Sequence, residues 1–200
     1  MKHIPIIALL TLAVSTPPLL SEEEPPAHLE AGDPTPEVVL RDADGGEYNL
    51  REHIAEQPAV LIFYRGGWCP LCNTHLMALG GIKEKLAESG RQILAISPDQ
   101  PAKIRETPDR EKLGYTLLSD SDMTAAKSFG VSFQVPGEEV SRLKTEFDID
   151  IEAASGKTHH KLPHPAVFVV GKDGVIRFAH VNPDYTDRLD PEAILKAANE

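Results

Sequence analysis

Runs of consecutive apolar residues mark the interior of the chain. The most continuous is Ala59-Val60-Leu61-Ile62-Phe63-Tyr64, and similar runs follow at residues 92–97, 115–118 and 166–170. A strand that is covered on both faces shows no polar alternation, so short apolar runs bounded by polar residues or glycine indicate buried strands. We therefore predict that these runs form the centre of a folded domain.

Apolar residues at helical spacing separate these strands. Between the first two runs the pattern is closed by Gly90, and near the C-terminus Asp190 and Pro191 have the residue types of an N-cap and a first helical turn. Strands that alternate with helices favour an α/β fold with a mainly parallel central sheet. Helices are predicted over residues 70–88, 101–112 (interrupted at Pro108), 123–129 and 191–198.

Two hairpins extend this sheet at its edges. An N-terminal hairpin is predicted over residues 38–50, around a turn rich in Asp and Gly. A closing hairpin joins 166–170 to 175–179 through Gly171-Lys172-Asp173-Gly174. Hairpin strands are antiparallel, so the predicted architecture is a central mixed sheet flanked by helices.

The composition divides the chain into three parts. Residues 35–200 have the pattern of a single domain, in which the polar segment 133–163 is predicted to be an insertion over one end of the sheet, with a possible helix over 136–147. Residues 16–34 are rich in Pro and Glu and cannot build a core, so we expect a mobile leader there.

Residues 1–15 have the pattern of a secretory signal peptide. Lys2 supplies a positive charge, residues 4–14 are apolar, and Ala13 and Ser15 are small residues at the positions that a signal peptidase inspects. The apolar run is too short to cross about 30 Å of hydrocarbon, so we expect no stable membrane insertion. The expected location is the periplasm or the exterior of the cell.

The formal net charge of -11 argues against nucleic acid as a partner. Sequence-independent binding to nucleic acid needs Lys and Arg to neutralise phosphate groups, and an acidic chain lacks that excess. We therefore predict no nucleic-acid partner.

Cys69 and Cys72 are the only two cysteines, and they lie three residues apart. A disulfide that closes so small a ring removes little entropy from the unfolded chain, which disfavours a purely structural role. Redox chemistry or metal binding explains the spacing better.

The cysteine pair falls where a buried strand ends and a helix begins. The first turn of a helix has unpaired N–H groups and a partial positive charge, and both stabilise a thiolate over a thiol. Pro70 lacks an N–H and suits that turn. The position therefore predicts a pair that cycles between dithiol and disulfide.

Two neighbours are candidates for a role at this site. Arg65 is expected to add positive charge beside the sulfurs, or else to be an ordinary exposed arginine at a strand end. Trp68, the only tryptophan, either shapes the rim of the site or fills a gap in the packing. The sequence leaves both pairs of alternatives open.

Taken together, Phe63-Tyr64-Arg65-Gly66-Gly67-Trp68-Cys69-Pro70-Leu71-Cys72 and the helix after it resemble the peroxiredoxin-like branch (alkyl hydroperoxide reductase/thiol-specific antioxidant) of the thioredoxin-fold superfamily. The segments Thr116-Leu117-Leu118-Ser119-Asp120 and 168–177 resemble it too. The likeness covers residues 34–198 except the segment 133–163. It implies a thioredoxin-like fold, reduction of hydroperoxides without a cofactor, and an external thiol reductant such as thioredoxin.

The resemblance also assigns residues. Cys72 takes the position of the family's peroxide-attacking cysteine, while Arg65 and Cys69 replace the proline and the Thr/Ser of its Pro-x-x-x-Thr/Ser-x-x-Cys motif. Pro165 occupies the position at which typical peroxiredoxins have an arginine. In thioredoxin-like proteins the same position holds a proline that is cis and faces the dithiol, so the resemblance also implies a cis bond before Pro165. His164, just before it, becomes a candidate modulator of the sulfurs.

Three functions remain open at this point. In a thiol peroxidase, Cys72 attacks a hydroperoxide and Cys69 completes the disulfide. In a thiol-disulfide oxidoreductase, Cys69 attacks a partner's disulfide and Cys72 resolves it. In a copper- or zinc-binding module, Cys69, Cys72 and His75 supply ligands, with His159, His160 and His164 as further candidates. We take the exported thiol peroxidase as the main hypothesis and assign it no metal.

Overall fold

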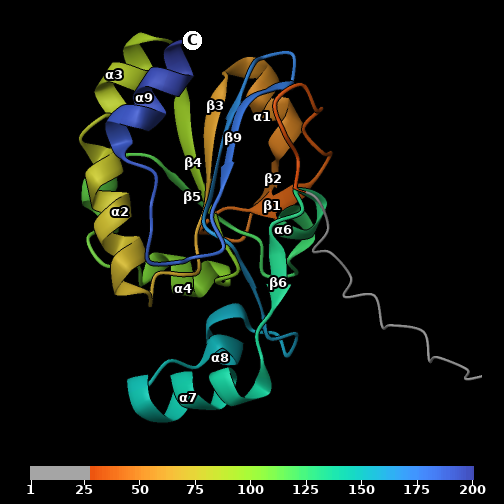
Figure 1. Ribbon diagram of the computed structural model, residues 1–200, viewed down its shortest axis with the longest axis vertical. Coiled ribbons are helices and arrows are strands. Elements are labelled where there is room, and N and C mark those ends of the chain that lie inside the picture. The colour runs from red at the N-terminus through yellow and green to blue at the C-terminus, as the bar shows by residue number, and fades with distance from the viewer. Residues whose placement is uncertain (1–27) are drawn as a thin grey trace, which may run out of the picture.

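The computed structural model describes residues 28–200. The predicted signal peptide and most of the predicted leader lie outside the described residues. The chain from residue 28 onward forms a central sheet with helices on both faces, as Figure 1 shows.

The central sheet has seven strands and is mixed, as predicted. In spatial order the strands are β2 (Glu47–Asn49), β1 (Val39–Arg41), β5 (Thr116–Ser119), β4 (Gln92–Ser97), β3 (Ala59–Phe63), β8 (Ala166–Val170) and β9 (Ile176–Val181). The three central strands β3, β4 and β5 are parallel. Every other strand is antiparallel to the neighbour through which it joins the sheet.

The central strand β3 supplies side chains to both hydrophobic cores. Leu61 and Phe63 face the core under α1 (Leu50–Glu56) and α6 (Thr124–Ser128). Val60 and Ile62 face the opposite core. The helices over that second core are α2 (Pro70–Gly80), α3 (Lys83–Glu88), α4 (Pro101–Arg105), α5 (Arg110–Leu113) and α9 (Pro191–Asn199).

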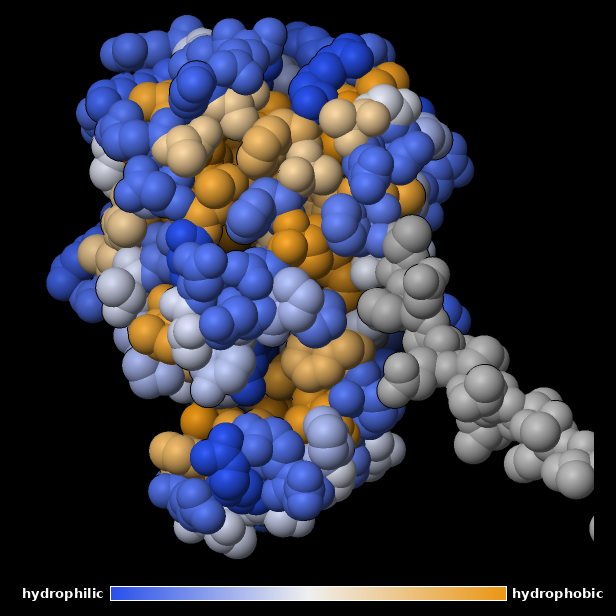
Figure 2. All heavy atoms as spheres, viewed as in Figure 1, coloured by the Kyte–Doolittle hydropathy of each residue, from blue (hydrophilic) through white to orange (hydrophobic). Residues whose placement is uncertain are grey.

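The segment 133–163 forms a small unit at one end of the sheet, with the predicted helix in place as α7 (Gly137–Phe147). It also contains α8 (Ile151–Ser155) and a two-stranded ribbon of β6 (Ser132–Gln134) and β7 (Lys161–Pro163), which the sequence did not reveal because each strand has three residues. We call residues 132–163 the insertion. Hydrophobic side chains gather where it meets the rest of the molecule (Figure 2).

Two predicted boundaries need correction. The predicted helix 70–88 is two helices, because Gly80 and Gly81 weaken the helix and the Gly81 N–H bonds to the Ala78 carbonyl in a tighter turn. The predicted interruption of helix 101–112 at Pro108 is confirmed, since α4 ends at Arg105 and α5 begins at Arg110. Residues 28–34, assigned by composition to the leader, belong to the fold, since Leu29 and Gly32 donate backbone hydrogen bonds to Phe129 and Ile176.

The aromatic cluster of the first core gives a test of this packing. Phe168 is fully buried and contacts the rings of Phe63 and Phe129. We expect Phe168→Ala to lower the free energy of unfolding by about 3–5 kcal/mol, because it leaves a cavity among these rings. Phe147→Ala, at a side chain that is 55% exposed, is the control and should cost less than about 1 kcal/mol in urea unfolding. Equal losses in the two variants would contradict the core described here.

Candidate active site

A tight loop joins β3 to α2 and positions the cysteines. After Phe63, the Tyr64 N–H still bonds to the Ile96 carbonyl, and the chain then turns at Gly66 with a φ of 146°. A Cβ at Gly66 would lie 2.3 Å from Nε1 of Trp68 and 2.8 Å from Oδ1 of Asp99, so only glycine fits there. The loop can therefore approach Asp99 closely before the helix starts.

Both sulfurs lie at the start of α2, as the sequence predicted. Cys69 is the N-cap residue and Pro70 the first residue of the helix, which places Cys72 in the first turn. Both thiols are free, and the residues are 3% and 1% exposed. Burial raises the energy of a thiolate, so nearby groups have to compensate for the lost water.

The surroundings favour ionisation of one sulfur over the other. The pKa of Cys69 is lowered to about 6, first by a hydrogen bond from the Cys72 thiol and then by the Cys72 backbone N–H and the charges of Arg65 and Arg188. The pKa of Cys72 is raised well above its usual value, because this thiol donates that hydrogen bond and because it is buried. The surroundings therefore favour a thiolate on Cys69 over one on Cys72.

Arg65 lies beside this pair and is itself 7% exposed. Its guanidinium carbon is 5.2 Å from the ring centre of Trp68 and 4.2 Å from that of Tyr185. A guanidinium stacked on aromatic rings keeps its charge while it is screened from water. Of the two alternatives that the sequence left open, the structure places Arg65 at the site and not on the exposed surface.

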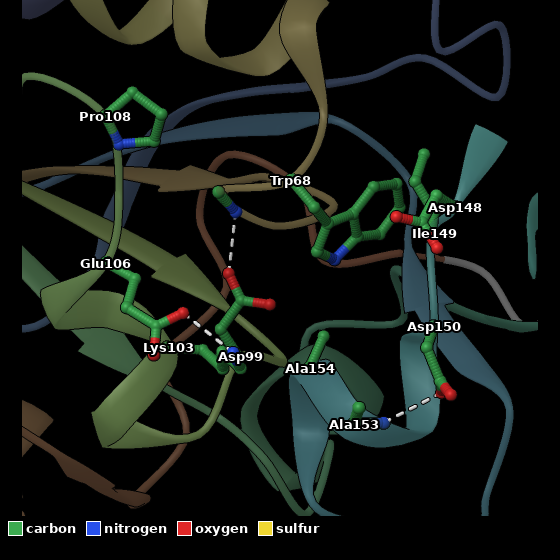
Figure 3. A pocket seen from close by; sticks show the side chains of 11 residues that line it. Trp68, Asp99, Lys103, Glu106, Pro108, Asp148, Ile149, Asp150, Ala153 and Ala154 are labelled. Atoms are coloured by element: carbon green, nitrogen blue, oxygen red, sulfur yellow. Dashed lines mark hydrogen bonds and ion pairs between the residues drawn. The ribbon is translucent and has the colours of Figure 1, made fainter.

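Trp68 connects the site to the insertion. Its ring packs against the core under α2 and also against the apolar cluster of the insertion, which includes Leu143 and Ile151. Beside it lies a cavity of about 320 Å³, lined by Trp68 and Asp99 on one side and by Ile149 and Ala154 of the insertion on the other (Figure 3). Gly67 and Trp68 thus place the cysteine loop along one wall of this cavity.

Asp99 is a site neighbour that sequence reasoning missed. Its Oδ2 accepts a 2.6 Å hydrogen bond from the Gly67 N–H, which ties the cysteine loop to the end of β4 (Figure 3). Burial raises its pKa to about 6. The only sequence signal was an acidic residue directly after a buried strand.

His164 and Pro165 lie near Arg65. The His164 ring stacks on Phe133 with centroids 4.4 Å apart, and burial lowers its pKa. Together with Arg65 and Tyr185 these residues line a second cavity of about 340 Å³. The peptide bond before Pro165 is trans, not cis as the resemblance implied. The Pro165 carbonyl instead accepts the Asn182 N–H, in an extended segment leading into β8.

Arg188 is the second functional candidate that the sequence did not reveal. Its Nη2 lies 3.6 Å from Sγ of Cys72, 116 residues away in sequence. It belongs to the loop between β9 and α9, where no motif or periodicity pointed to the dithiol. Only the fold brings this charge to the sulfur.

The family of the chain can now be established. The sequence profile of the AhpC/TSA family matches residues 31–179. The chain belongs to this family. Its thioredoxin-like fold and its assignment to the thiol-peroxidase class of enzymes are thereby confirmed.

Known relatives of this AhpC/TSA protein agree with that assignment. Peroxiredoxin Bcp of Escherichia coli K12 is 30% identical over 172 residues, which cover 86% of this chain and 97% of that protein. The chloroplastic peroxiredoxin Q of Oryza sativa subsp. japonica is 27% identical over 161 residues, 80% of this chain and 61% of the rice protein.

Solved structures show the same fold. Peroxidoxin BcpB from Mycobacterium tuberculosis superposes with a TM-score of 0.67 at 21% identity, covering 86% of this chain and 97% of that one. Reduced Prx3 from Vibrio vulnificus in complex with H2O2 gives 0.68 at 17% identity, with coverage of 85% and 99%.

The histidines proposed as metal ligands have other partners in this AhpC/TSA protein. Nε2 of His75 lies 3.1 Å from the Leu189 carbonyl, His159 contacts the Ser121 carbonyl, and His160 pairs with Glu152. Among residues 28–200, no three side chains of His, Cys, Asp or Glu gather in a way that could hold a metal ion. Nor does this part of the chain contain a helix long and apolar enough to cross a membrane.

The lowered pKa of Cys69 predicts a specific pH dependence. The reaction of the reduced protein with iodoacetamide should accelerate through a midpoint near pH 6, because the thiolate that reacts is present above its pKa. Cys72→Ser should keep this midpoint, since the serine hydroxyl can also donate to the Cys69 sulfur. Cys69→Ser should lose it. A wild-type midpoint near that of free cysteine, about 8.5, would contradict the electrostatics described here.

Proposed function

We propose that this protein reduces hydroperoxides through the Cys69/Cys72 dithiol, with an external thiol as the electron donor. The observation that carries the proposal is the pair of free thiols at the start of α2, with Nη2 of Arg188 3.6 Å from Sγ of Cys72. Its membership of the AhpC/TSA family supports the choice of a peroxide as substrate.

The first step oxidises one sulfur. The Cys69 thiolate attacks the terminal oxygen of the hydroperoxide, an S–O bond forms, and the O–O bond breaks. The leaving alkoxide takes up a proton and departs as an alcohol, or as water when the substrate is hydrogen peroxide. Cys69 is left as a sulfenic acid, and the peroxide has been reduced.

The second step closes the disulfide. Cys72 loses its proton and attacks the sulfenic sulfur, an S–S bond forms, and the hydroxide that leaves combines with that proton to give water. Two external thiols then reduce the disulfide and become a disulfide themselves. A thioredoxin-type protein is the proposed donor.

Cys69 is assigned the first attack on electrostatic grounds. The family's motif places its attacking cysteine at Cys72, but here Cys69 has the lowered pKa and Cys72 the raised one. Only a thiolate attacks, and the surroundings favour the thiolate on Cys69. Cys69 is thus the nucleophile in this proposal, and Cys72 the resolving cysteine.

The burial of both sulfurs favours a small oxidant over a protein disulfide. Cys69 and Cys72 are almost inaccessible, with 3% and 1% of their surface exposed. A hydroperoxide needs to bring only one oxygen atom to the sulfur, whereas a protein disulfide must align two sulfur atoms with it. We therefore place peroxide reduction ahead of disulfide exchange.

Peroxide kinetics with single variants test this mechanism. At pH 7, hydrogen peroxide should oxidise the reduced protein at least about tenfold faster than free cysteine, of which only a few per cent is thiolate. Cys72→Ser should accumulate a sulfenic acid at Cys69 that a dimedone probe labels, and Cys69→Ser should not react rapidly. Rapid labelling in Cys69→Ser alone would move the attack to Cys72. A wild-type rate equal to that of free cysteine would refute peroxidase activity.

We propose further that the protein is exported. The support is the N-terminal sequence itself, with Lys2, the apolar residues 4–14 and the small residues Ala13 and Ser15. The full chain, expressed in a bacterium, should be recovered outside the cytoplasm with its N-terminal residues removed. Leu10→Arg should block this, because a charge interrupts the apolar run. Recovery of the uncleaved wild-type chain in the cytoplasm would contradict export.

A further inference from the structure

The loop between β9 and α9 crosses from the sheet to the dithiol. We call residues 182–190 the strap; Figure 1 shows it in dark blue, running from the end of β9 toward α2 before it turns up into α9. Its own contacts hold it in shape. Asn182 donates to Asp187 at 2.8 Å, Thr186 donates to Asp184 at 2.7 Å, and Asp190 caps α9.

Two side chains of the strap contact different groups of the redox site. Tyr185 stacks on the guanidinium of Arg65. Arg188 places Nη2 at 3.6 Å from Sγ of Cys72. One short segment therefore contacts the groups around both sulfurs.

His75 holds the strap at Leu189, the residue that follows Arg188. This residue lies on α2, one turn beyond Cys72, and its Nε2 lies 3.1 Å from the carbonyl oxygen of Leu189. Burial lowers the pKa of His75, so the neutral ring donates its Nε2–H to that carbonyl. Since Leu189 follows Arg188 directly, the hydrogen bond ties the arginine to the helix that carries its target.

The charge of Arg188 is available to the sulfur. None of the ion pairs between residues 28 and 200 includes Arg188. Its second nitrogen, Nη1, donates to the Asp187 carbonyl, which orients the group without neutralising it. The other groups that face Cys72 are the Cys69 sulfur, the Arg65 backbone N–H and the Tyr64 hydroxyl.

Cys72 needs such a partner because it has to ionise twice in the cycle. It attacks the sulfenic acid as a thiolate, and it leaves as a thiolate when the reductant attacks Cys69 in the disulfide. The thiol is 1% exposed, so water cannot stabilise either charge. A guanidinium in contact with the sulfur can do so.

We propose that Arg188 is a catalytic residue that stabilises the Cys72 thiolate in two steps, when Cys72 attacks the sulfenic acid and when it leaves Cys69 during reduction of the disulfide. His75 is the positioning residue that holds Arg188 beside Cys72. This inference rests on the proposed function and assigns a residue to disulfide closure and to the reduction that follows it. In closure, the Cys72–Cys69 bond forms while hydroxide leaves and takes the thiol proton. In reduction, an external thiolate bonds to Cys69 and the electron pair of the broken S–S bond goes to Cys72.

A single-turnover experiment separates the two steps. The reduced full chain is mixed with one equivalent of hydrogen peroxide, and the sulfenic acid and the disulfide are followed by quenching and mass spectrometry. In Arg188→Gln, disulfide closure should slow by about tenfold or more, as expected for the loss of a hydrogen bond from a charged group. Sulfenic acid formation should slow less than closure, because Arg188 is the weakest of the groups that lower the pKa of Cys69. Arg188→Lys should recover part of the rate. Arg177→Gln, at the far end of the sheet, should match wild type.

A comparison of two substitutions at His75 tests whether this residue positions Arg188. His75→Leu should slow closure, because the strap loses its tie to α2. His75→Gln retains an N–H donor and should restore most of the rate. If His75→Leu and His75→Gln are slowed equally, or neither is, the positioning role is refuted.

A second measurement does not depend on peroxide chemistry. The disulfide is formed with diamide and its reduction by dithiothreitol is timed; Arg188→Gln should again be about tenfold slower than wild type, because the leaving thiolate has lost its counter-charge. Closure and reduction at wild-type rates in Arg188→Gln would overturn this inference and leave the peroxidase intact. Slow reduction in a protein that peroxide does not oxidise would uphold the role of Arg188 and refute the proposed function.

Discussion

The site depends on how a buried pair of sulfurs can hold one negative charge. Cys69 and Cys72 have almost no contact with water, so the stabilisation of a thiolate has to come from fixed groups. The first turn of α2 supplies backbone N–H groups, Arg65 supplies a charge from the loop before it, and Arg188 supplies another from the strap. Because Arg188 lies 116 residues from Cys72 in the sequence, the complete arrangement exists only in the folded chain.

Three other parts of the fold contact this site and hold it in place. Parallel pairing of β3 with β4 brings Asp99 to the cysteine loop, where its carboxylate binds the Gly67 N–H and fixes the approach to the helix. The insertion packs on Trp68 and so covers one side of the site. The strap covers another side and carries Tyr185 to Arg65. The insertion and the strap thus pack against two different neighbours of the cysteine pair.

The local features of the sequence predicted most of this fold. The apolar runs predicted the strands β3, β4 and β8, and the position of the cysteines at the start of a helix was also predicted. Short elements escaped prediction: β6 and β7 have three residues each, and α1 was overlooked although Asn49 has the residue type of its N-cap. Arg188 could not be predicted, because its role comes from a tertiary contact across 116 residues and not from a motif. The trans bond at Pro165 shows that a family feature cannot be carried over without coordinates.

The central claim is that the two sulfurs act as one redox unit. The most direct test is the intact mass and disulfide map of the reduced full chain after one equivalent of hydrogen peroxide. The account predicts the loss of two hydrogen atoms and a single peptide in which Cys69 and Cys72 are bonded to each other. A stable gain of oxygen on the wild-type protein, a disulfide between two chains, or two thiols that stay free would contradict it.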